Sequence, residues 1–488
     1  MKPLPMSNPV DPSALHPSQR PRALDVIAGL NKQELSAAEL LRDTYEHIAK
    51  VNNDLNAICT LRPYEEALID ARDVDARRRQ GEVMPPLAGL PMAIKDLAST
   101  KGLLTTMGSP ILKDNVPDTD SLFVSRLRAA GAVIIGKTNT PEFGAGSHTF
   151  NPVFGTTHNP YDAKRIAGGS SGGAAVALAS GMLALADGSD MGGSLRNPAA
   201  YNNVVGLRPS MGRVPSWPLL SSRFARMAVE GPMARTVEDC ALLLSVMAGP
   251  DPRDPRSLAW AVDDFAASLE TDVSQYRLGW APRPMGIPIE ADVSKVLSRA
   301  AQRMWQLCPS TEEIDLNELS GAMDVFEILR AAAFAMLMGD LHQTHSADMK
   351  PTLRDNIAQG INLSTADIYR AEHLRSALFE KLLGLFERFD YLLLPVTQVM
   401  PFPVEIEYPE VIEGKPMANY IEWMTSCCML SPFDVPCLSV PAGFNDQGLP
   451  VGLQIVGKPG DDLGVLRLAY AFQQATEYWR RSPLQAGD

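Results

Sequence analysis

The sequence has little of what a membrane protein or a disulfide-rich protein needs. No apolar run in its 488 residues approaches the roughly 20 residues that cross a bilayer, and the first residues contain no apolar stretch typical of a secretory signal. Six cysteines are few for this length, and none forms a C-x-x-C pair. We therefore expect a cytoplasmic protein with reduced thiols and no membrane partner. A reactive pair at Cys427 and Cys428 stays an alternative to two buried thiols that act as small apolar groups.

Basic charge is also scarce. The net charge is −13, whereas a protein that binds nucleic acid needs a basic face for the phosphates. No Gly-Lys-Ser or Gly-Lys-Thr follows either of the glycine clusters described below, which excludes a P-loop nucleotide site. We expect no nucleic-acid partner.

Two glycine-rich segments that carry serines are the most informative feature present. Residues 168–173 read Gly-Gly-Ser-Ser-Gly-Gly, and residues 186–196 read Ala-Asp-Gly-Ser-Asp-Met-Gly-Gly-Ser-Leu-Arg. Glycines beside a serine allow unusual backbone angles, so several N–H groups can converge on one point. An oxyanion hole needs such a convergence, and Ser194 is therefore a candidate nucleophile.

A serine nucleophile needs a base, because its hydroxyl is almost wholly protonated at neutral pH. None of the seven histidines lies in a segment that resembles a catalytic triad, and no G-x-S-x-G elbow surrounds Ser194. Lys95 follows the apolar residues 90–94, where the neutral form of an amine is favoured. The alternative is an ion pair between Lys95 and Asp96 at the end of a strand, and the local sequence does not separate the two.

Helix and strand signals alternate at short spacing, which predicts an α/β protein. Ser36 and Glu39 form a capping-box pattern at the start of an amphipathic helix, and Asp120 is expected to cap a helix over residues 121–130. A further helix is predicted over residues 237–247 and a buried strand over 391–395. Since no internal repeat or low-complexity linker interrupts the chain, we expect one large domain over residues 23–485. An N-terminal arm covers residues 1–22, and residues from about 258 to 390 form a more helical part.

Three segments resemble the signature blocks of the amidase signature hydrolases. They are residues 90–96 (Leu-Pro-Met-Ala-Ile-Lys-Asp), 168–173 and 190–196 (Asp-Met-Gly-Gly-Ser-Leu-Arg). The resemblance is dense from about residue 85 to 240, returns from about 390 to 460, and is weak in between. It implies an α/β fold with a central mixed β-sheet and helices on both faces of the sheet.

The resemblance also implies catalytic roles, position by position. Ser194 matches the nucleophile, and Lys95 matches the general base. Ser170 matches a bridging serine that follows a cis peptide bond and passes a proton between the other two. This Ser-cisSer-Lys triad requires no metal and no other cofactor.

The remaining positions of the signature blocks imply supporting roles. The oxyanion hole would consist of four backbone N–H groups, those of Met191, Gly192, Gly193 and Ser194. Ser171 would hydrogen-bond Lys95 or nearby backbone. Asp190 and Arg196 would pair and hold the nucleophile loop.

The implied activity is hydrolysis of the C–N bond of a small-molecule amide through an acyl-enzyme on Ser194, and a carbamate (urethane) substrate is left open. The segments expected to wall the pocket are rich in Phe, Trp, Met and Leu, which favours small hydrophobic or aryl substrates; they are residues 143–150, 217–224, 326–338 and 421–433. The alternative is that these side chains are simply core.

Two alternatives to a free-standing enzyme follow from the same motifs. A glutamine-hydrolysing subunit of a tRNA amidotransferase would share all three blocks and would work with partner subunits. A non-catalytic binding protein on the same fold would be expected to lose Lys95, Ser170 or Ser194, and all three are present. The sequence leaves a homodimer open.

Overall fold

The computed structural model of the protein describes residues 21–218, 227–259 and 264–483. The N-terminal arm predicted over residues 1–22 lies almost entirely outside the described residues. Most of the wall segment predicted over residues 217–224 does so as well. Among the described helices, none combines the length and the apolar character needed to cross a membrane.

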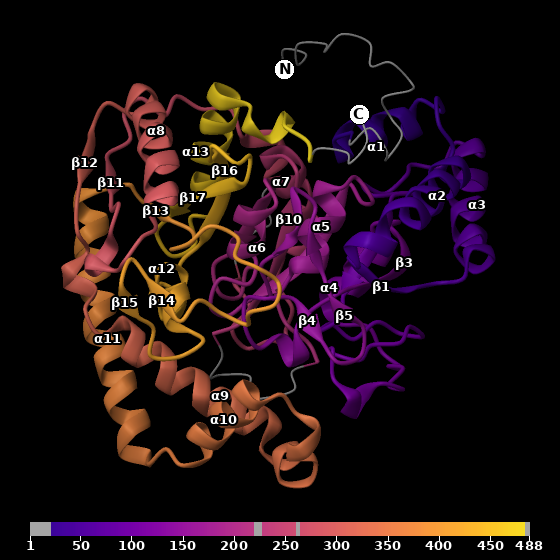
Figure 1. Ribbon diagram of the computed structural model, residues 1–488. Coiled ribbons are helices and arrows are strands. Elements are labelled where there is room, and N and C mark those ends of the chain that lie inside the picture. Colours follow the sequence, from indigo (N-terminus) through magenta and orange to yellow (C-terminus); the bar gives the residue numbers. More distant parts are fainter. Residues whose placement is uncertain (1–20, 219–226, 260–263, 484–488) are drawn as a thin grey trace.

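The centre of the molecule is an eight-stranded mixed sheet in the order β12-β11-β13-β17-β16-β9-β10-β8 (Figure 1). β11 runs parallel to β12 and β13, and all other neighbours are antiparallel. Its strands are β8 (Leu185–Asp190), β9 (Val205–Arg208), β10 (Val229–Ala234), β11 (Leu278–Trp280), β12 (Thr311–Glu313), β13 (Tyr391–Pro395), β16 (Cys437–Phe444) and β17 (Pro450–Val456).

A three-stranded sheet continues this arrangement at β8. Its order is β1-β3-β2, formed by β1 (Ile58–Leu61), β2 (Pro91–Lys95) and β3 (Val133–Thr138). The main-chain N–H of Lys95 donates to the Asp187 carboxylate on β8 at 3.2 Å, so β2 lies along β8. The buried strand predicted to deliver Lys95 is therefore present. Three two-stranded ribbons lie outside the sheets: β4 (Phe150–Asn151) with β5 (Gly155–Thr156), β6 (His158–Asn159) with β7 (Asp162–Ile166), and β14 (Val411–Ile412) with β15 (Lys415–Pro416).

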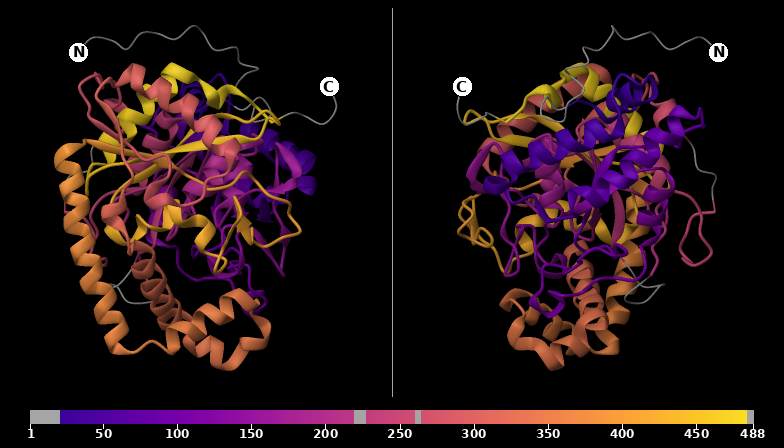
Figure 2. Two further views of the ribbon diagram at one scale, coloured as in Figure 1. Left: turned by 60° about the vertical axis from the view of Figure 1, so that its left-hand side comes forward. Right: turned by 90° about the vertical axis from the view of Figure 1, so that its right-hand side faces the viewer.

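Helices cover the sheets and extend beyond them. Those of the first half are α1 (Ala23–Asn31), α2 (Ala37–Leu55), α3 (Tyr64–Arg79), α4 (Leu122–Ala129), α5 (Gly172–Ala179), α6 (Arg196–Tyr201) and α7 (Val237–Met247). Those of the second half are α8 (Ala291–Leu307), α9 (Ala322–His345), α10 (Pro351–Ile361), α11 (Thr365–Arg388), α12 (Thr425–Cys428) and α13 (Asp462–Thr476). α9 and α10 lie together at one end of the molecule, and α11 runs from that end along one side towards β12 (Figures 1 and 2).

The helix starts test two sequence predictions. The capping box of Ser36 and Glu39 at the start of α2 is confirmed, because both of its hydrogen bonds are present. The prediction that Asp120 caps α4 is wrong, since the N-cap position is Ser121. The Asp120 carboxylate instead accepts hydrogen bonds from Arg128 Nε at 2.9 Å and from the Lys101 N–H at 2.7 Å.

Successive residues of β17 contact helices on opposite faces of the central sheet. Leu453 and Ile455 belong to the large core cluster that also contains buried side chains of α8 and α13. On the other face, a Cβ added to Gly452 would lie 2.7 Å from Ala200 Cβ on α6, and Gln454 accepts a hydrogen bond from Arg196. Successive side chains of a strand point to opposite faces, so both faces are covered. The predicted α/β fold with a flanked mixed sheet is confirmed.

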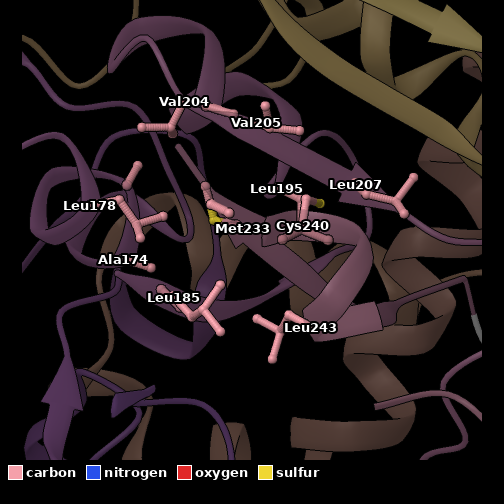
Figure 3. Close-up of a cluster of buried hydrophobic side chains, with 14 of the residues drawn as sticks. Ala174, Leu178, Leu185, Leu195, Val204, Val205, Leu207, Met233, Cys240 and Leu243 are labelled. Carbon is pink, nitrogen blue, oxygen red and sulfur yellow. The ribbon is translucent and has the colours of Figure 1, made fainter. Parts of the chain in front are cut away.

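Leu195 anchors the chain in this core directly after Ser194 (Figure 3). Its side chain is fully buried in the cluster that includes α5, β8, β9, β10 and α7. An added Cβ at Gly188 would lie 2.6 Å from Leu195 Cδ2, and one at Gly206 would lie 2.3 Å from the Leu195 carbonyl oxygen. These two glycines therefore let the chain after Ser194 approach β8 and β9 closely.

Candidate active site

Lys95 is buried at the end of β2, with 1% of its surface exposed. Its Nζ donates hydrogen bonds to Ser170 Oγ at 2.7 Å and Ser171 Oγ at 2.8 Å. It also lies 3.1 Å from Ser189 Oγ. Nζ also lies 3.4 Å from the Ser189 carbonyl oxygen, but its two shortest hydrogen bonds join serine hydroxyls, so the lysine is held where a proton can pass to or from a serine.

The ion-pair alternative for Lys95 is wrong. Within the described part of the chain, no carboxylate lies within ion-pair distance of Lys95 Nζ, whereas the Asp96 carboxylate accepts hydrogen bonds from the Thr106 N–H and hydroxyl. Burial lowers the pKa of Lys95 to about 7, although the charges of Asp187 and Asp190 oppose this shift. A lysine with this pKa is largely neutral in mildly alkaline solution and can accept a proton.

The segment that carries Ser170 and Ser171 precedes α5. The Gly169–Ser170 peptide bond is cis. Ser147, which belongs to a different loop, donates from Oγ to the Gly169 carbonyl at 2.8 Å and so helps to hold this segment in place. The Ser171 N–H donates to the Ser194 carbonyl oxygen at 3.2 Å, so the two glycine-rich segments lie against each other.

Ser194 lies in the turn between β8 and α6 and is half-buried. Its hydroxyl has no hydrogen-bond partner among residues 21–218, 227–259 and 264–483. The structure therefore joins Lys95, Ser170 and Ser171 in one hydrogen-bonded group. It brings Ser194 to this group through the backbone, without a hydrogen bond between the hydroxyls of Ser170 and Ser194.

Three of the four predicted oxyanion-hole donors are free to bind a substrate oxygen. The N–H groups of Met191, Gly192 and Ser194 have no acceptor in the described structure. The N–H of Gly193 donates to Asp190 Oδ1 at 2.8 Å. The assignment of Gly193 to the oxyanion hole is therefore wrong, because its donor points inward to a carboxylate.

Asp190 and Arg196 form a fully buried ion pair beneath the nucleophile loop. Arg196 Nε and Nη2 donate to the two carboxylate oxygens at 3.0 and 2.9 Å, and the Leu195 N–H donates to Oδ2 at 3.1 Å. Burial opposes ionisation of this carboxyl, but the charges of Arg196 and Arg208 outweigh it and hold the pKa of Asp190 well below its usual range. The loop that carries Ser194 is thus hydrogen-bonded to a carboxylate that stays ionised.

Several residues around the site were missed by sequence reasoning. Arg208 Nη1 donates to the Asp190 carbonyl at 2.5 Å, and Gln454 Oε1 accepts from Arg196 Nη1 at 2.6 Å. Asp187 lay inside the second glycine-rich segment, and its position next to Lys95 could have been suspected there. Arg208 and Gln454 come from other strands and carry no local signal.

Cys427 and Cys428 pack beneath the same loop. Cys428 Sγ donates to the Gly192 carbonyl at 3.3 Å, and a Cβ added to Gly193 would lie 2.8 Å from Cys427 Cβ. Both thiols are free and fully buried, and burial raises the pKa of Cys427 to about 12 and that of Cys428 well above its ordinary value. The interpretation as buried packing groups is confirmed, and the reactive pair is wrong. No three His, Cys, Asp or Glu side chains of the described segments are grouped so that they could hold a metal ion.

Apolar side chains from the predicted wall segments meet at Met191. Phe143 and Met191 pack against Phe334 and Met338 of α9 in one hydrophobic cluster. A Cβ added to Gly192 would lie 2.7 Å from Phe326 Cζ, so the same helix also covers the neighbouring loop residue. Two of the predicted wall segments therefore lie next to Met191 and Gly192, whose N–H groups have no acceptor in the described structure.

The family model, the relatives by sequence and the similar solved structures agree with one another. The family model described as Amidase matches residues 39–466. A glutamyl-tRNA(Gln) amidotransferase subunit of Moorella thermoacetica is 35% identical over 477 residues, which cover 93% of this chain and 96% of that protein. A bacterial aryl acylamidase of the amidase signature enzymes has a TM-score of 0.88 and 31% identity over 95% of this chain and 98% of its own. A 6-aminohexanoate cyclic dimer hydrolase has a TM-score of 0.86 and 26% identity over 97% and 99%. The chain therefore belongs to the amidase signature family, whose hydrolases cleave the C–N bonds of amides.

Proposed function

We propose that the protein is an amidase for small hydrophobic or aryl substrates that works through an acyl-enzyme on Ser194. The observation that carries this proposal is the environment of Lys95. A buried amine with a pKa of about 7, bonded to Ser170 and Ser171 and paired with no carboxylate of the described chain, is suited to act as a general base.

The proposed reaction begins with proton transfer. Lys95 takes a proton from Ser170 as Ser170 takes the proton of Ser194, and the Ser194 oxygen attacks the substrate carbonyl carbon. The N–H groups of Met191, Gly192 and Ser194 stabilise the negative oxygen of the tetrahedral intermediate. Ser170 then gives a proton to the leaving nitrogen and recovers one from Lys95, which leaves an ester on Ser194. Water hydrolyses this ester by the same relay, so every proton removed is returned.

The relay requires one movement within the site. The Ser194 hydroxyl is unbonded in the described structure, so rotation about its Cα–Cβ bond is open to it, and the Ser171–Ser194 backbone hydrogen bond holds the two segments together. Catalytic hydrogen bonds often form only when substrate is bound.

Apolar surroundings support the choice of substrate. The cluster of Phe143, Met191, Phe334 and Met338 offers an apolar wall to an acyl or aryl group. One structural relative is described as an aryl acylamidase. A carbamate presents the same carbonyl carbon to Ser194 and is included in the proposal.

A second candidate is glutamine hydrolysis within a multi-subunit amidotransferase. It is favoured by the similarity to the Moorella thermoacetica protein, which extends over nearly the whole of both chains. In that case the protein would copurify with partner subunits and release ammonia from glutamine in their presence. A homodimer without other subunits would favour the free-standing amidase.

The test is hydrolysis of a substrate panel by the purified protein and by Ser194→Ala. The panel contains anilides, aliphatic amides, aryl carbamates, glutamine and asparagine. We expect the anilides or aryl carbamates to be hydrolysed fastest by the wild type, and neither to be hydrolysed by Ser194→Ala. A strong preference for glutamine or asparagine would overturn the proposed substrate class.

A further inference from the structure

Arg330 is a buried cation on the helix that covers the nucleophile loop. Only 6% of its surface is exposed. It lies on α9 four residues after Phe326 and four residues before Phe334, and residues at this spacing share one face of a helix. Phe326 reaches Gly192, and Phe334 packs in the cluster that contains Met191. Arg330 is therefore on the face of α9 directed at the oxyanion-hole segment.

The contacts of Arg330 leave most of its donors unused. Its Nη1 donates to Asn356 Oδ1 on α10. Its guanidinium carbon lies 4.3 Å from the ring centre of Phe334 and 5.3 Å from that of Tyr420. Among the described residues no carboxylate lies within ion-pair distance of it. A buried arginine is normally paired, because transfer of its charge out of water is costly.

The neighbouring charges are already satisfied. Lys350 Nζ donates to Glu407 at 3.1 Å and to the Ala145 carbonyl at 2.7 Å. Glu142 accepts hydrogen bonds from the Ser109 hydroxyl and the Lys350 N–H. Glu327, one turn before Arg330 on α9, accepts a hydrogen bond from Asn419 at 3.1 Å. Within the described chain, Arg330 is thus the cation of this group that has no acidic partner.

Tyr420 supplies a second unused donor next to Arg330. Its side chain is 7% exposed, and its buried hydroxyl lies beside the Arg330 guanidinium but donates to no acceptor in the described structure. A buried hydroxyl whose proton has no acceptor is rare in folded proteins. The planar guanidinium and the phenol together present the donors that a carboxylate accepts.

From this juxtaposition we infer that Arg330 and Tyr420 bind a carboxylate of the substrate at a distance from the bond that is cleaved. The inference rests on the proposed function and narrows it: the preferred substrate is an apolar or aryl amide that carries an acidic group. The apolar cluster would hold the body of such a molecule, and the two donors would hold its charged end.

The experiment compares acidic and neutral substrates that differ in one group. One pair is 4-acetamidobenzoate and acetanilide, with the acid on the amine side. The other is the mono-anilide of glutaric acid and the anilide of pentanoic acid, with the acid on the acyl side. In at least one pair we expect the wild type to hydrolyse the acidic member with a KM lower by about 10-fold or more, which is the effect of a charge-assisted hydrogen bond.

Variants assign that preference to the two residues. Arg330→Met should remove the preference by raising KM for the acidic member about 10-fold or more relative to the neutral member of the same pair, since a neutral substrate gains little from the cation. Arg330→Lys keeps the charge but loses the two-point geometry, and it should restore part of the preference. Tyr420→Phe removes only a hydroxyl whose proton has no acceptor in the described structure, so the variant should fold normally and weaken the preference. Arg370→Met removes an exposed cation from α11 and should change nothing.

The outcomes separate the inference from the proposed function. Hydrolysis of neutral anilides that depends on Ser194, without preference for either acid, would overturn the inference alone. Equal losses on both members of a pair in Arg330→Met and Tyr420→Phe would overturn it as well. Absence of Ser194-dependent hydrolysis of both anilides and aryl carbamates would overturn the proposed function.

Discussion

The Asp187 carboxylate accepts the main-chain N–H of Lys95 at 3.2 Å, and both residues are buried. This contact joins the end of β2 to β8 at the position of the candidate base. Burial raises the pKa of Asp187 to about 6, and burial lowers the pKa of Lys95 to about 7 against the charges of Asp187, Asp190 and Glu230. Asp187 therefore positions the lysine and is one of the charges that favour its protonated form.

The activity should rise with pH through the pKa of Lys95. Only the neutral amine accepts a proton, and burial brings the pKa of Lys95 down from its usual 10.5 to about 7. We expect kcat/KM for a neutral anilide to increase with a midpoint near pH 7 and to level off above it. Lys95→Arg should be inactive, because arginine stays protonated. A midpoint near 10, or no dependence on pH, would contradict the assignment of Lys95 as the base.

The substitution Asp187→Asn should move this midpoint to lower pH. The asparagine keeps an oxygen that accepts the Lys95 N–H but removes a negative charge that stabilises the protonated amine. The pH profile of kcat/KM measures the shift. Asp446→Asn, which removes a carboxylate at an exposed ion pair with Lys295, is the matched control and should leave the midpoint in place. A shift to higher pH would show that Asp187 acts in another way.

Ser170→Ala should lower kcat strongly without changing the fold. The alanine removes the hydroxyl through which Lys95 and Ser194 would exchange a proton, and loss of a general acid–base group typically costs about 10²–10⁴ in rate. Steady-state kinetics and labelling of Ser194 by a fluorophosphonate would measure the loss, and circular dichroism would check the fold. Wild-type rates in this variant would refute the relay.

Arg196→Met should destabilise the protein by an amount below the about 3–5 kcal/mol that a fully uncompensated buried charge costs, because Arg208 still lies 3.5 Å from the Asp190 carboxylate. The change leaves Asp190 buried and also removes the donor to Gln454. Denaturant unfolding followed by fluorescence would measure the effect. Arg480→Met is the matched control. It makes the same substitution in an exposed ion pair with Glu477 and should change stability little. Equal effects of the two substitutions would argue against a special role of the buried pair.

The sequence correctly predicted those elements whose signals, apolar patterns and capping residues, lie within the element or directly next to it. α7 and β13 begin and end where their apolar patterns and flanking residues predicted, and the capping box placed the start of α2. The glycine-rich segments pointed to the region of the site because close backbone approach requires glycine. At Gly193, with φ of +112°, both the backbone angle and the contact with Cys427 exclude a larger residue.

Contacts between distant segments could not be predicted in the same way. Asp120 has the side chain of a helix cap, but Lys101 and Arg128 hold its carboxylate elsewhere. The N–H of Gly193 turns inward because Asp190 is fixed by arginines of α6 and β9. Arg330 looked like any charged residue of a long helix, and only the packing of α9 against the loop shows how deeply it is buried.

The two thiols beneath the nucleophile loop have a practical consequence. Cys427 and Cys428 are fully buried, and the segment that carries Ser194 forms part of their cover, because Gly192 and Gly193 lie against their side chains. The rate at which an alkylating reagent modifies these sulfurs would therefore report how often this cover opens, and an acyl group on Ser194 that holds the segment in place should slow the modification.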